Sequence, residues 1–115
     1  MNTRVIGALK EDMAISYLEQ NGFEIIERNF KCKIGEIDVI AKKDDVIRFI
    51  EIKYRKGNVA GGAYYAISKN KLIKISKIAN FYIMTHPNSN TSYSIDAIII
   101  ENENIEYLKN IFGGM

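Results

Sequence analysis

The sequence predicts an α/β fold, and three observations lead to that prediction. Two segments repeat apolar residues at steps of three and four, which is typical of amphipathic helices. Five shorter segments are rich in Ile, Val, Phe and Tyr, which favours β-strands. Along the 115 residues these segments follow the order helix, three strands, helix, two strands. This order predicts a mixed central sheet flanked by helices.

The first helix is expected over residues 3–21. Thr3 can cap its start, and Gly22 suits its C-terminal end. Its apolar positions, spaced at helical steps, are Ile6, Leu9, Met13, Ala14, Tyr17 and Leu18. We expect this stripe to face the sheet.

Three strands are expected next, at residues 23–31, 37–41 and 46–54. Gly35 separates the first strand from the second. The second and third are joined by "KKDD", residues 42–45, which we interpret as a four-residue turn. The strands at residues 37–41 and 46–54 are therefore predicted to form an antiparallel hairpin.

The second half of the chain begins with a Gly-rich loop over residues 55–68. A second helix is expected from Ser68 to about residue 85, with its lysines mostly opposite the apolar stripe. That stripe includes Leu72, Ile75, Ile78, Ala79 and Tyr82. After the turn-rich loop "HPNSN", strands are expected at residues 93–100 and 105–112, and a short helix is the alternative for the last segment.

Composition narrows the class of protein. The length favours one domain, spanning residues 1–115. The formal net charge of +2 is only mildly basic, so the sequence does not suggest a dedicated nucleic-acid coat. Cys32 and His86 are the only residues of their types, which argues against a disulfide, a Cys/His zinc site and a Ser-His or Cys-His nucleophile. The N-terminus has no long apolar run, so we expect a cytoplasmic protein.

Three charged residues interrupt the apolar strands of the predicted hairpin: Asp38, Glu51 and Lys53. With a four-residue turn, Asp38 lies opposite Phe49 and diagonal to Glu51. Because side chains alternate along a strand, all three charged groups then point to the same face. A one-residue slip would send Asp38 to the other face.

Two convergent carboxylates repel each other, and a divalent cation removes the conflict. Mg²⁺ prefers oxygen ligands, and a neighbouring lysine can hold a phosphate or orient a water. This combination of groups suits phosphodiester hydrolysis. The alternative is a surface of charges that merely pair with one another. The isoleucines and valine that flank the charges indicate a cleft in a buried sheet, which makes the two interpretations about equal at this point.

The segments "GEID" and "IEIKYR" resemble the core of the PD-(D/E)XK nuclease superfamily, which has the restriction-endonuclease-like fold. The sequence is most similar to the YraN-type (UPF0102) family, which is distantly similar to archaeal Holliday junction resolvases. The resemblance covers nearly the whole chain, including "KEDMAISYLEQNGFEIIERNFKCKIGEIDVIA", "IRFIEIKYRK", the Lys-rich second helix and "YSIDAIII". Ile37 replaces the proline that gives the superfamily its name, a change that the family with "GEID" shares.

The resemblance implies a role for each matching residue of the hairpin. Asp38 and Glu51 would be metal-binding carboxylates, and the backbone carbonyl of Ile52 would be a further ligand. Lys53 would be the catalytic lysine. Glu11 matches a glutamate that related resolvases bring to the metal, often through water, and a plain surface residue is the alternative.

Other polar residues are candidates for supporting roles. The residues expected to contact nucleic acid are Tyr54, Arg55, Lys69 and Lys71. Asp96 is either a third acidic group near the site or a partner for a buried donor. Glu36 is a secondary acidic candidate.

The resemblance therefore implies an endonuclease that uses Mg²⁺, or Mn²⁺ in its place, to cut structured or branched DNA. A homodimer is expected if the substrate is a symmetric junction, because such a junction needs two cuts. No membrane partner is expected. The alternatives are a nucleic-acid-binding module without catalysis and a protein-interaction module that uses the nuclease fold.

Overall fold

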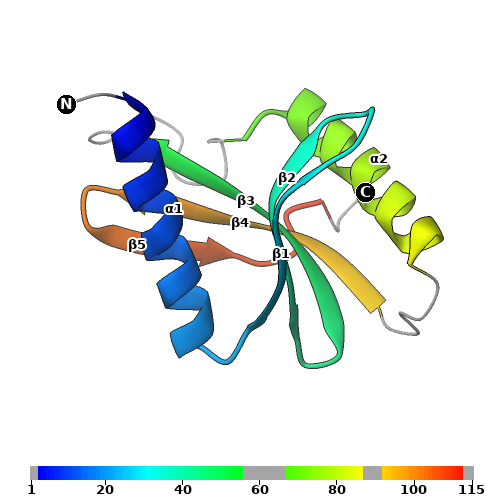
Figure 1. Ribbon diagram of the computed structural model, residues 1–115, viewed down its shortest axis with the longest axis horizontal. Helices are drawn as coiled ribbons and strands as arrows, with labels where there is room; N and C mark the ends of the chain where they lie inside the picture. Colours follow the sequence, from blue (N-terminus) through cyan, green and yellow to red (C-terminus); the bar gives the residue numbers. More distant parts are fainter. Residues whose placement is uncertain (1–2, 56–66, 87–91, 113–115) are drawn as a thin grey trace.

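The chain folds into an α/β structure with two helices on opposite faces of one sheet (Figure 1). The computed structural model describes residues 3–55, 67–86 and 92–112. Its elements are α1 (Thr3–Gln20), β1 (Glu24–Lys31), β2 (Glu36–Lys43), β3 (Val46–Arg55), α2 (Lys69–Thr85), β4 (Ser92–Glu101) and β5 (Asn104–Leu108). The predicted fold class is confirmed, and the element order is that of a restriction-endonuclease-like core.

The sheet is mixed, as predicted. Its strands lie in the order β1-β2-β3-β4-β5. Strands β3 and β4 run parallel, and the other three neighbouring pairs are antiparallel. A parallel pair needs a long crossover connection, and α2 lies on the connection from β3 to β4.

Helix α1 ends through the glycine predicted to stop it. Gly22 adopts a φ of 85°, which a residue without a Cβ reaches at little cost. The Phe23 N–H donates to the carbonyl of Leu18 at 3.0 Å, and the Gly22 N–H donates to the carbonyl of Glu19 at 3.2 Å. These two bonds form a Schellman motif, which satisfies carbonyls left unpaired at the end of the helix.

The beginning of α1 differs from the prediction at one position. Leu9 was expected on the buried stripe, but it is 53% exposed. The residues of α1 that pack on the apolar cluster of the sheet begin one turn later, at Met13, so Leu9 has no place in that cluster. The predicted cap Thr3 and the apolar Ile6 have side chains that lie outside the described ones.

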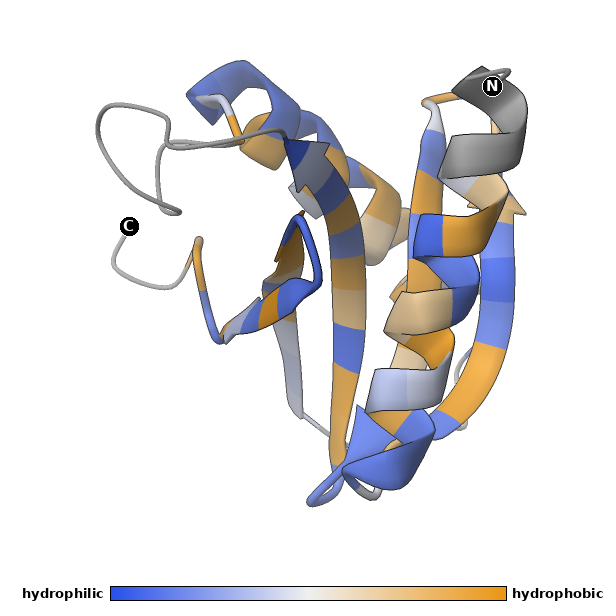
Figure 2. Ribbon diagram, turned by 90° about the vertical axis from the view of Figure 1, so that its left-hand side faces the viewer, coloured by the Kyte–Doolittle hydropathy of each residue, from blue (hydrophilic) through white to orange (hydrophobic). Residues whose placement is uncertain are grey.

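Each face of the sheet carries its own apolar core, and the apolar parts of the strands lie between the two helices (Figure 2). On one face, α1 packs Ala14, Ile15 and Leu18 against Val39, Ala41, Ile50, Ile98 and Ile100. On the other face, α2 packs Ile75, Ile78, Ala79 and Tyr82 against Ile37, Ile40, Ile47, Phe49 and Ile95. Burial on both faces explains why the central strands β2, β3 and β4 contain near-continuous apolar runs, whereas the edge strand β1 is mostly exposed.

The hairpin between β2 and β3 corrects the predicted register. Lys43 pairs with Val46, so the turn consists of Asp44 and Asp45 alone, and the predicted four-residue turn is wrong. Both turn residues have positive φ, 55° and 59°, as a type I′ turn requires. The backbone of a type I′ turn matches the right-handed twist of the flanking strands, which favours it as a two-residue hairpin connection.

The correction shifts the pairing by two residues. Phe49 pairs with Ile40 rather than with Asp38. The described pairing ends at Val39 with Ile50, and beyond it the Asp38 side chain reaches β3 through the backbone N–H of Ile52. Because a shift by two residues preserves the face to which each side chain points, the predicted convergence of the two carboxylates is retained.

The last predicted strand is present but shorter than expected. Strand β5 ends at Leu108, and its pairing with β4 excludes the alternative of a short helix. After it, the Ile111 N–H donates to the carbonyl of Ile95 at 2.8 Å, so the chain continues beside β4 toward the start of that strand.

The two predicted loops fall largely outside the described residues: this holds for residues 56–66 of the Gly-rich loop and for 87–91, which include most of "HPNSN". Of the helices that the structure describes, neither has the length and apolarity needed to span a membrane.

Candidate active site

A cavity of about 440 Å³ lies between β3 and the beginning of α2. Its lining residues are Glu51, Ile52, Lys53, Ile67, Ser68 and Lys71. Strand β3 contributes the first three, so Glu51 and Lys53, which alternation places on one face of the strand, line the same cavity. Lys53 is exposed to solvent. The structure therefore brings two of the three predicted catalytic residues into one concave site.

Asp38 reaches this site from β2. Its Oδ2 accepts a hydrogen bond from the backbone N–H of Ile52 at 2.8 Å. The described ladder between β2 and β3 ends one residue earlier, at Val39 and Ile50, so the carboxylate supplies an acceptor at the point where backbone pairing stops. This bond anchors the Asp38 side chain beside Glu51.

The environment of Glu51 opposes its ionisation. Burial, followed by the hydrogen bond and the charge of Asp38, raises the pKa of Glu51 to about 8, although the nearby Lys71 ammonium acts in the opposite direction. At pH 7 without a metal, the Glu51 carboxyl group is therefore mostly protonated. A strongly perturbed carboxyl group in a cavity is a marker of functional sites.

One carboxylate oxygen of Glu51 is buried and accepts no hydrogen bond from the described residues. The side chain is only 13% exposed, and Oε2 is buried without a hydrogen-bond donor among the described residues. Among the described residues, the Nζ of Lys71 lies 3.6 Å from this oxygen, which is an ion-pair distance rather than a hydrogen bond. A buried oxygen in this state is costly unless something binds it.

The donor set fits a hard divalent cation. Asp38, Glu51 and the carbonyl of Ile52 offer oxygen ligands, which Mg²⁺ and Mn²⁺ prefer. Within the described parts of the chain, no three His, Cys, Asp or Glu residues are grouped closely enough to hold a metal by themselves. Water or a substrate phosphate would thus have to complete the coordination, which is usual for Mg²⁺.

Glu11 lies elsewhere. Its Oε1 accepts hydrogen bonds from Arg28 Nη2 at 2.9 Å, Arg28 Nε at 3.2 Å and Asn29 Nδ2 at 3.0 Å. These contacts tie α1 to β1. No contact recorded for the described residues joins Glu11 to Asp38 or Glu51, so its role as a metal ligand stays a prediction.

The residues expected to contact nucleic acid are dispersed. The Tyr54 ring packs in the α1-side core, with the Nζ of Lys10 4.9 Å from its centroid. Arg55 Nε donates to Glu101 Oε2 at 2.7 Å, and Lys69 is exposed at the beginning of α2. Of these candidates only Lys71 lines the cavity. Its position beside Glu51 depends on the docking of α2, which the local sequence does not reveal.

Ser68 was not predicted as part of the site, although a serine before a helical pattern is a recognisable cap. Its Oγ accepts a hydrogen bond from the Lys71 backbone N–H at 3.2 Å. This bond fixes the first turn of α2 and with it the attachment point of the Lys71 side chain. Ile67, the other lining residue that was missed, gave no signal in the sequence.

Asp96 and Glu36 do not line the cavity. Asp96 is fully buried and accepts hydrogen bonds from Ser94 Oγ, Arg48 Nη1, Tyr107 OH and the Asn110 N–H. This supports its interpretation as a partner for buried donors. Glu36 is exposed, and its carboxylate lies 4.0 Å from the Lys31 ammonium.

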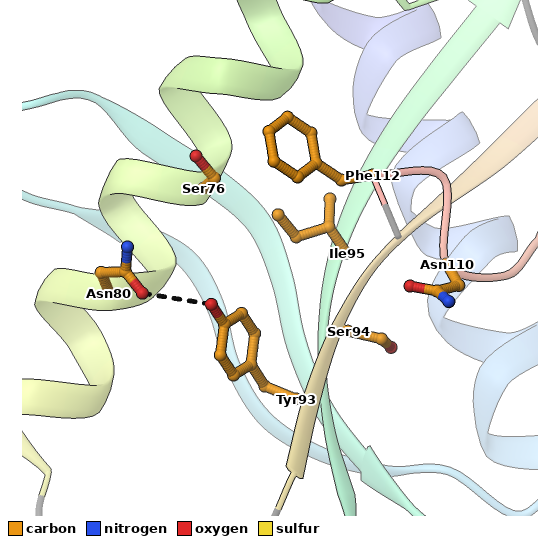
Figure 3. A pocket seen from close by; sticks show the side chains of 7 residues that line it. All are labelled: Ser76, Asn80, Tyr93, Ser94, Ile95, Asn110 and Phe112. Carbon is orange, nitrogen blue, oxygen red and sulfur yellow. Dashed lines mark hydrogen bonds between the residues drawn. The ribbon is translucent and has the colours of Figure 1, made fainter. Parts of the chain in front are cut away.

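A second cavity, of about 300 Å³, lies between α2 and β4 (Figure 3). It is lined by Ser76, Asn80, Tyr93, Ser94, Ile95, Asn110 and Phe112. The Tyr93 hydroxyl donates to Asn80 Oδ1 at 3.1 Å across it. These lining residues include no carboxylate, ammonium or guanidinium group, so they offer no metal or phosphate chemistry comparable with that at Glu51.

Comparison with known proteins finds one family and many similar chains. The family described as uncharacterised protein family UPF0102 matches residues 10–100, which include Asp38 and every residue lining the Glu51 cavity. A UPF0102 protein of Fusobacterium nucleatum is 40% identical over 99% of this chain and 96% of its own length. One of Campylobacter fetus is 41% identical over 93% of each chain. One of Helicobacter hepaticus is 42% identical over 96% of this chain and 97% of its own.

Proposed function

We propose, from the premise that the chain belongs to uncharacterised protein family UPF0102, that it is a Mg²⁺-dependent endonuclease acting on structured or branched DNA. The observation that carries the proposal is the pair formed by Asp38 and Glu51, with a buried oxygen of Glu51 left without a donor. A buried oxygen without a partner is costly, and a carboxyl group with a strongly raised pKa in a cavity indicates a ligand-binding site. The function requires access to DNA, in keeping with the cytoplasmic location expected from the sequence.

The residues divide the chemistry among them. Asp38, Glu51 and the Ile52 carbonyl would hold the cation. When bound, Mg²⁺ supplies charge neutralisation at the phosphate and lowers the pKa of a coordinated water. Lys53, exposed at the same cavity, orients the attacking water and donates to a phosphate oxygen. Asp38 keeps its position through the Ile52 N–H while the phosphate is attacked.

The test is cleavage of four-way, flap and linear DNA with Mg²⁺ or Mn²⁺. Asp38→Asn, Glu51→Gln and Lys53→Met should each reduce the rate by about 100-fold or more, because each removes charge at the reacting centre. Glu36→Gln is the matched control, since it removes an exposed carboxylate from the same strand as Asp38 and should leave the rate within about twofold.

Equal cleavage by the wild type and all variants would reveal a contaminating nuclease and overturn the proposal, as would an absence of cleavage of every substrate. If four-way DNA is the preferred substrate, two cuts are needed, and the active species should be a dimer by analytical ultracentrifugation with DNA bound.

A second candidate is a nucleic-acid-binding module without catalysis. It is favoured by the fact that only two carboxylates meet in the described site and that one of them holds a proton at neutral pH. This candidate predicts salt-dependent DNA binding that is unchanged in Asp38→Asn, with no hydrolysis. A protein-interaction module would instead show no DNA binding even at low salt.

A further inference from the structure

Lys71 is the one cation recorded in contact with the carboxylate pair among the described residues. Its Nζ lies 3.6 Å from the buried Oε2 of Glu51. The Lys71 side chain is 43% exposed, so the ammonium approaches Glu51 from the solvent side of the cavity. The Ser68 cap holds the backbone of Lys71 in place, which leaves the side chain free to reorient while its attachment point stays fixed.

We propose that the Lys71 ammonium and a divalent cation are alternative partners of Glu51. In the metal-free protein Lys71 compensates the carboxylate pair. When the cation binds, Lys71 swings to the open side of the cavity and becomes a ligand for a phosphate of the nucleic acid. This inference rests on the proposed function and adds a residue that couples entry of the metal to binding of the substrate.

The distances explain why the two cations compete. A Mg²⁺ ion lies about 2.1 Å from its oxygen ligands, so it and an ammonium 3.6 Å from Oε2 would repel at close range. No hydrogen bond ties the ammonium to Oε2, because the distance exceeds the ~3.2 Å limit for a good one. A lysine stem of four methylenes lets the ammonium move away without a backbone change.

The surroundings explain where the ammonium goes. The first turn of α2 contains no acidic residue but does contain Lys69 and Lys71. The N-terminal end of a helix dipole is positive, so the ammonium groups of these lysines are repelled by it. A bound anion relieves that repulsion. Once metal compensates Glu51, a substrate phosphate is therefore the natural partner for Lys71.

The experiment compares Lys71→Met with Lys69→Met, which removes the same charge from the same helical turn without touching the cavity. Mg²⁺ binding is measured by isothermal titration calorimetry at constant pH and ionic strength. Lys71→Met should bind Mg²⁺ about three- to fivefold more tightly than the wild type, the range of a partly exposed ion pair. Lys69→Met should match the wild type.

DNA affinity should change in the opposite direction. Binding of four-way DNA is measured in Mg²⁺ with Lys53→Met added to every protein so that the DNA stays intact. Lys71→Met should weaken binding about fivefold and lower the slope of log K against log salt by about 1. Circular dichroism checks that each variant is folded, which is expected because Lys71 is half exposed.

The outcomes separate this inference from the function it rests on. Weaker or unchanged Mg²⁺ binding by Lys71→Met would overturn the competition. Tighter Mg²⁺ binding without a loss of DNA affinity would overturn the phosphate role. No Mg²⁺ binding by the wild type would overturn the metal-dependent function itself, whereas Mg²⁺-dependent cleavage with identical Lys71→Met and Lys69→Met titrations would overturn only the role of Lys71.

Discussion

Glu51 shows how a single residue acquires its chemistry from its neighbours. In an exposed strand a glutamate would be ionised at neutral pH. Here burial and Asp38 together raise its pKa to about 8, and Lys71 only partly offsets them. The residue is consequently destabilising when it is charged and no cation is present. That property is the one expected of a group that binds a cation, as proposed above.

The raised pKa of Glu51 predicts that the difference in stability between the wild type and Glu51→Gln depends on pH. Between pH 4.5 and about 8 the folded protein holds a proton that the unfolded chain has lost. The stability that Glu51 contributes is therefore complete below pH 4.5 and lost as the pH rises through about 8. Glu51→Gln should be more stable than the wild type by at least about 1 kcal/mol above pH 8, or roughly 4 °C in Tm.

Thermal unfolding in EDTA at pH 5 and pH 9 measures this difference, which should be small at pH 5 and largest at pH 9. Saturating Mg²⁺ should raise the Tm of the wild type and not that of Glu51→Gln. A difference in stability that does not vary with pH would contradict the raised pKa.

At the scale of elements, the β2–β3 hairpin decides whether the site exists. The pair Asp44 and Asp45 forms its whole turn, and both residues adopt left-handed backbone angles. Asp tolerates this conformation better than most residues but less well than glycine. An even number of turn residues keeps Asp38 and Glu51 on the same face, and an odd number would separate them.

Substitutions at Asp45 should have opposite effects on stability. Asp45→Gly removes the cost of the φ of 59° and should stabilise the protein by about 1 kcal/mol, or roughly 4 °C in Tm. Asp45→Ala keeps the Cβ but loses the local side-chain hydrogen bonding that helps Asp, so it should lower Tm. Urea denaturation measures the stability of each variant against the wild type. If both variants change the free energy of unfolding in the same direction, the turn has another conformation.

At the scale of the molecule, a buried polar network joins the C-terminal strands to the centre of the sheet. Asp96 on β4 is 0% exposed and accepts hydrogen bonds from Arg48 on β3, Tyr107 on β5 and the Asn110 N–H beyond it. Burial, then the charge of Asp96, raises the pKa of Tyr107, so its hydroxyl stays a donor. The network fixes the chain after β5 against the sheet.

Asp96→Asn should therefore be strongly destabilising. It leaves the buried Arg48 guanidinium without its counter-charge, and removing one partner of a buried pair costs about 3–5 kcal/mol. Chemical denaturation should show this loss. The double variant Arg48→Met, Asp96→Asn should recover part of it, because no uncompensated charge remains. A loss below about 1 kcal/mol for the single variant would mean that solvent reaches Arg48.

Much of this architecture could be predicted from local patterns. Residues 3–21 and 68–85 have the helical period, and Gly22 has the conformational freedom that the end of α1 requires. The alternation in "IEIK" placed Glu51 and Lys53 on one face without any tertiary information. The predicted burial of Leu9 and the predicted length of β5 were wrong, because the packing at the end of an element depends on its tertiary contacts.

The sequence predicted the hairpin residues of the candidate site but not the tertiary contacts around them. Its carboxylates and lysine lie on one hairpin, whose parity is a property of the chain itself, so their convergence survived an error of two residues in the register. The position of Lys71 against Glu51, the tether of Glu11 to Arg28 and the burial that raises the pKa of Glu51 depend on how α1 and α2 dock on the sheet. The sequence by itself determined the elements and the face of the site, because periodicity acts between near neighbours. Only the tertiary structure decided the partners and the charge state, because these depend on contacts and desolvation between segments far apart in the chain.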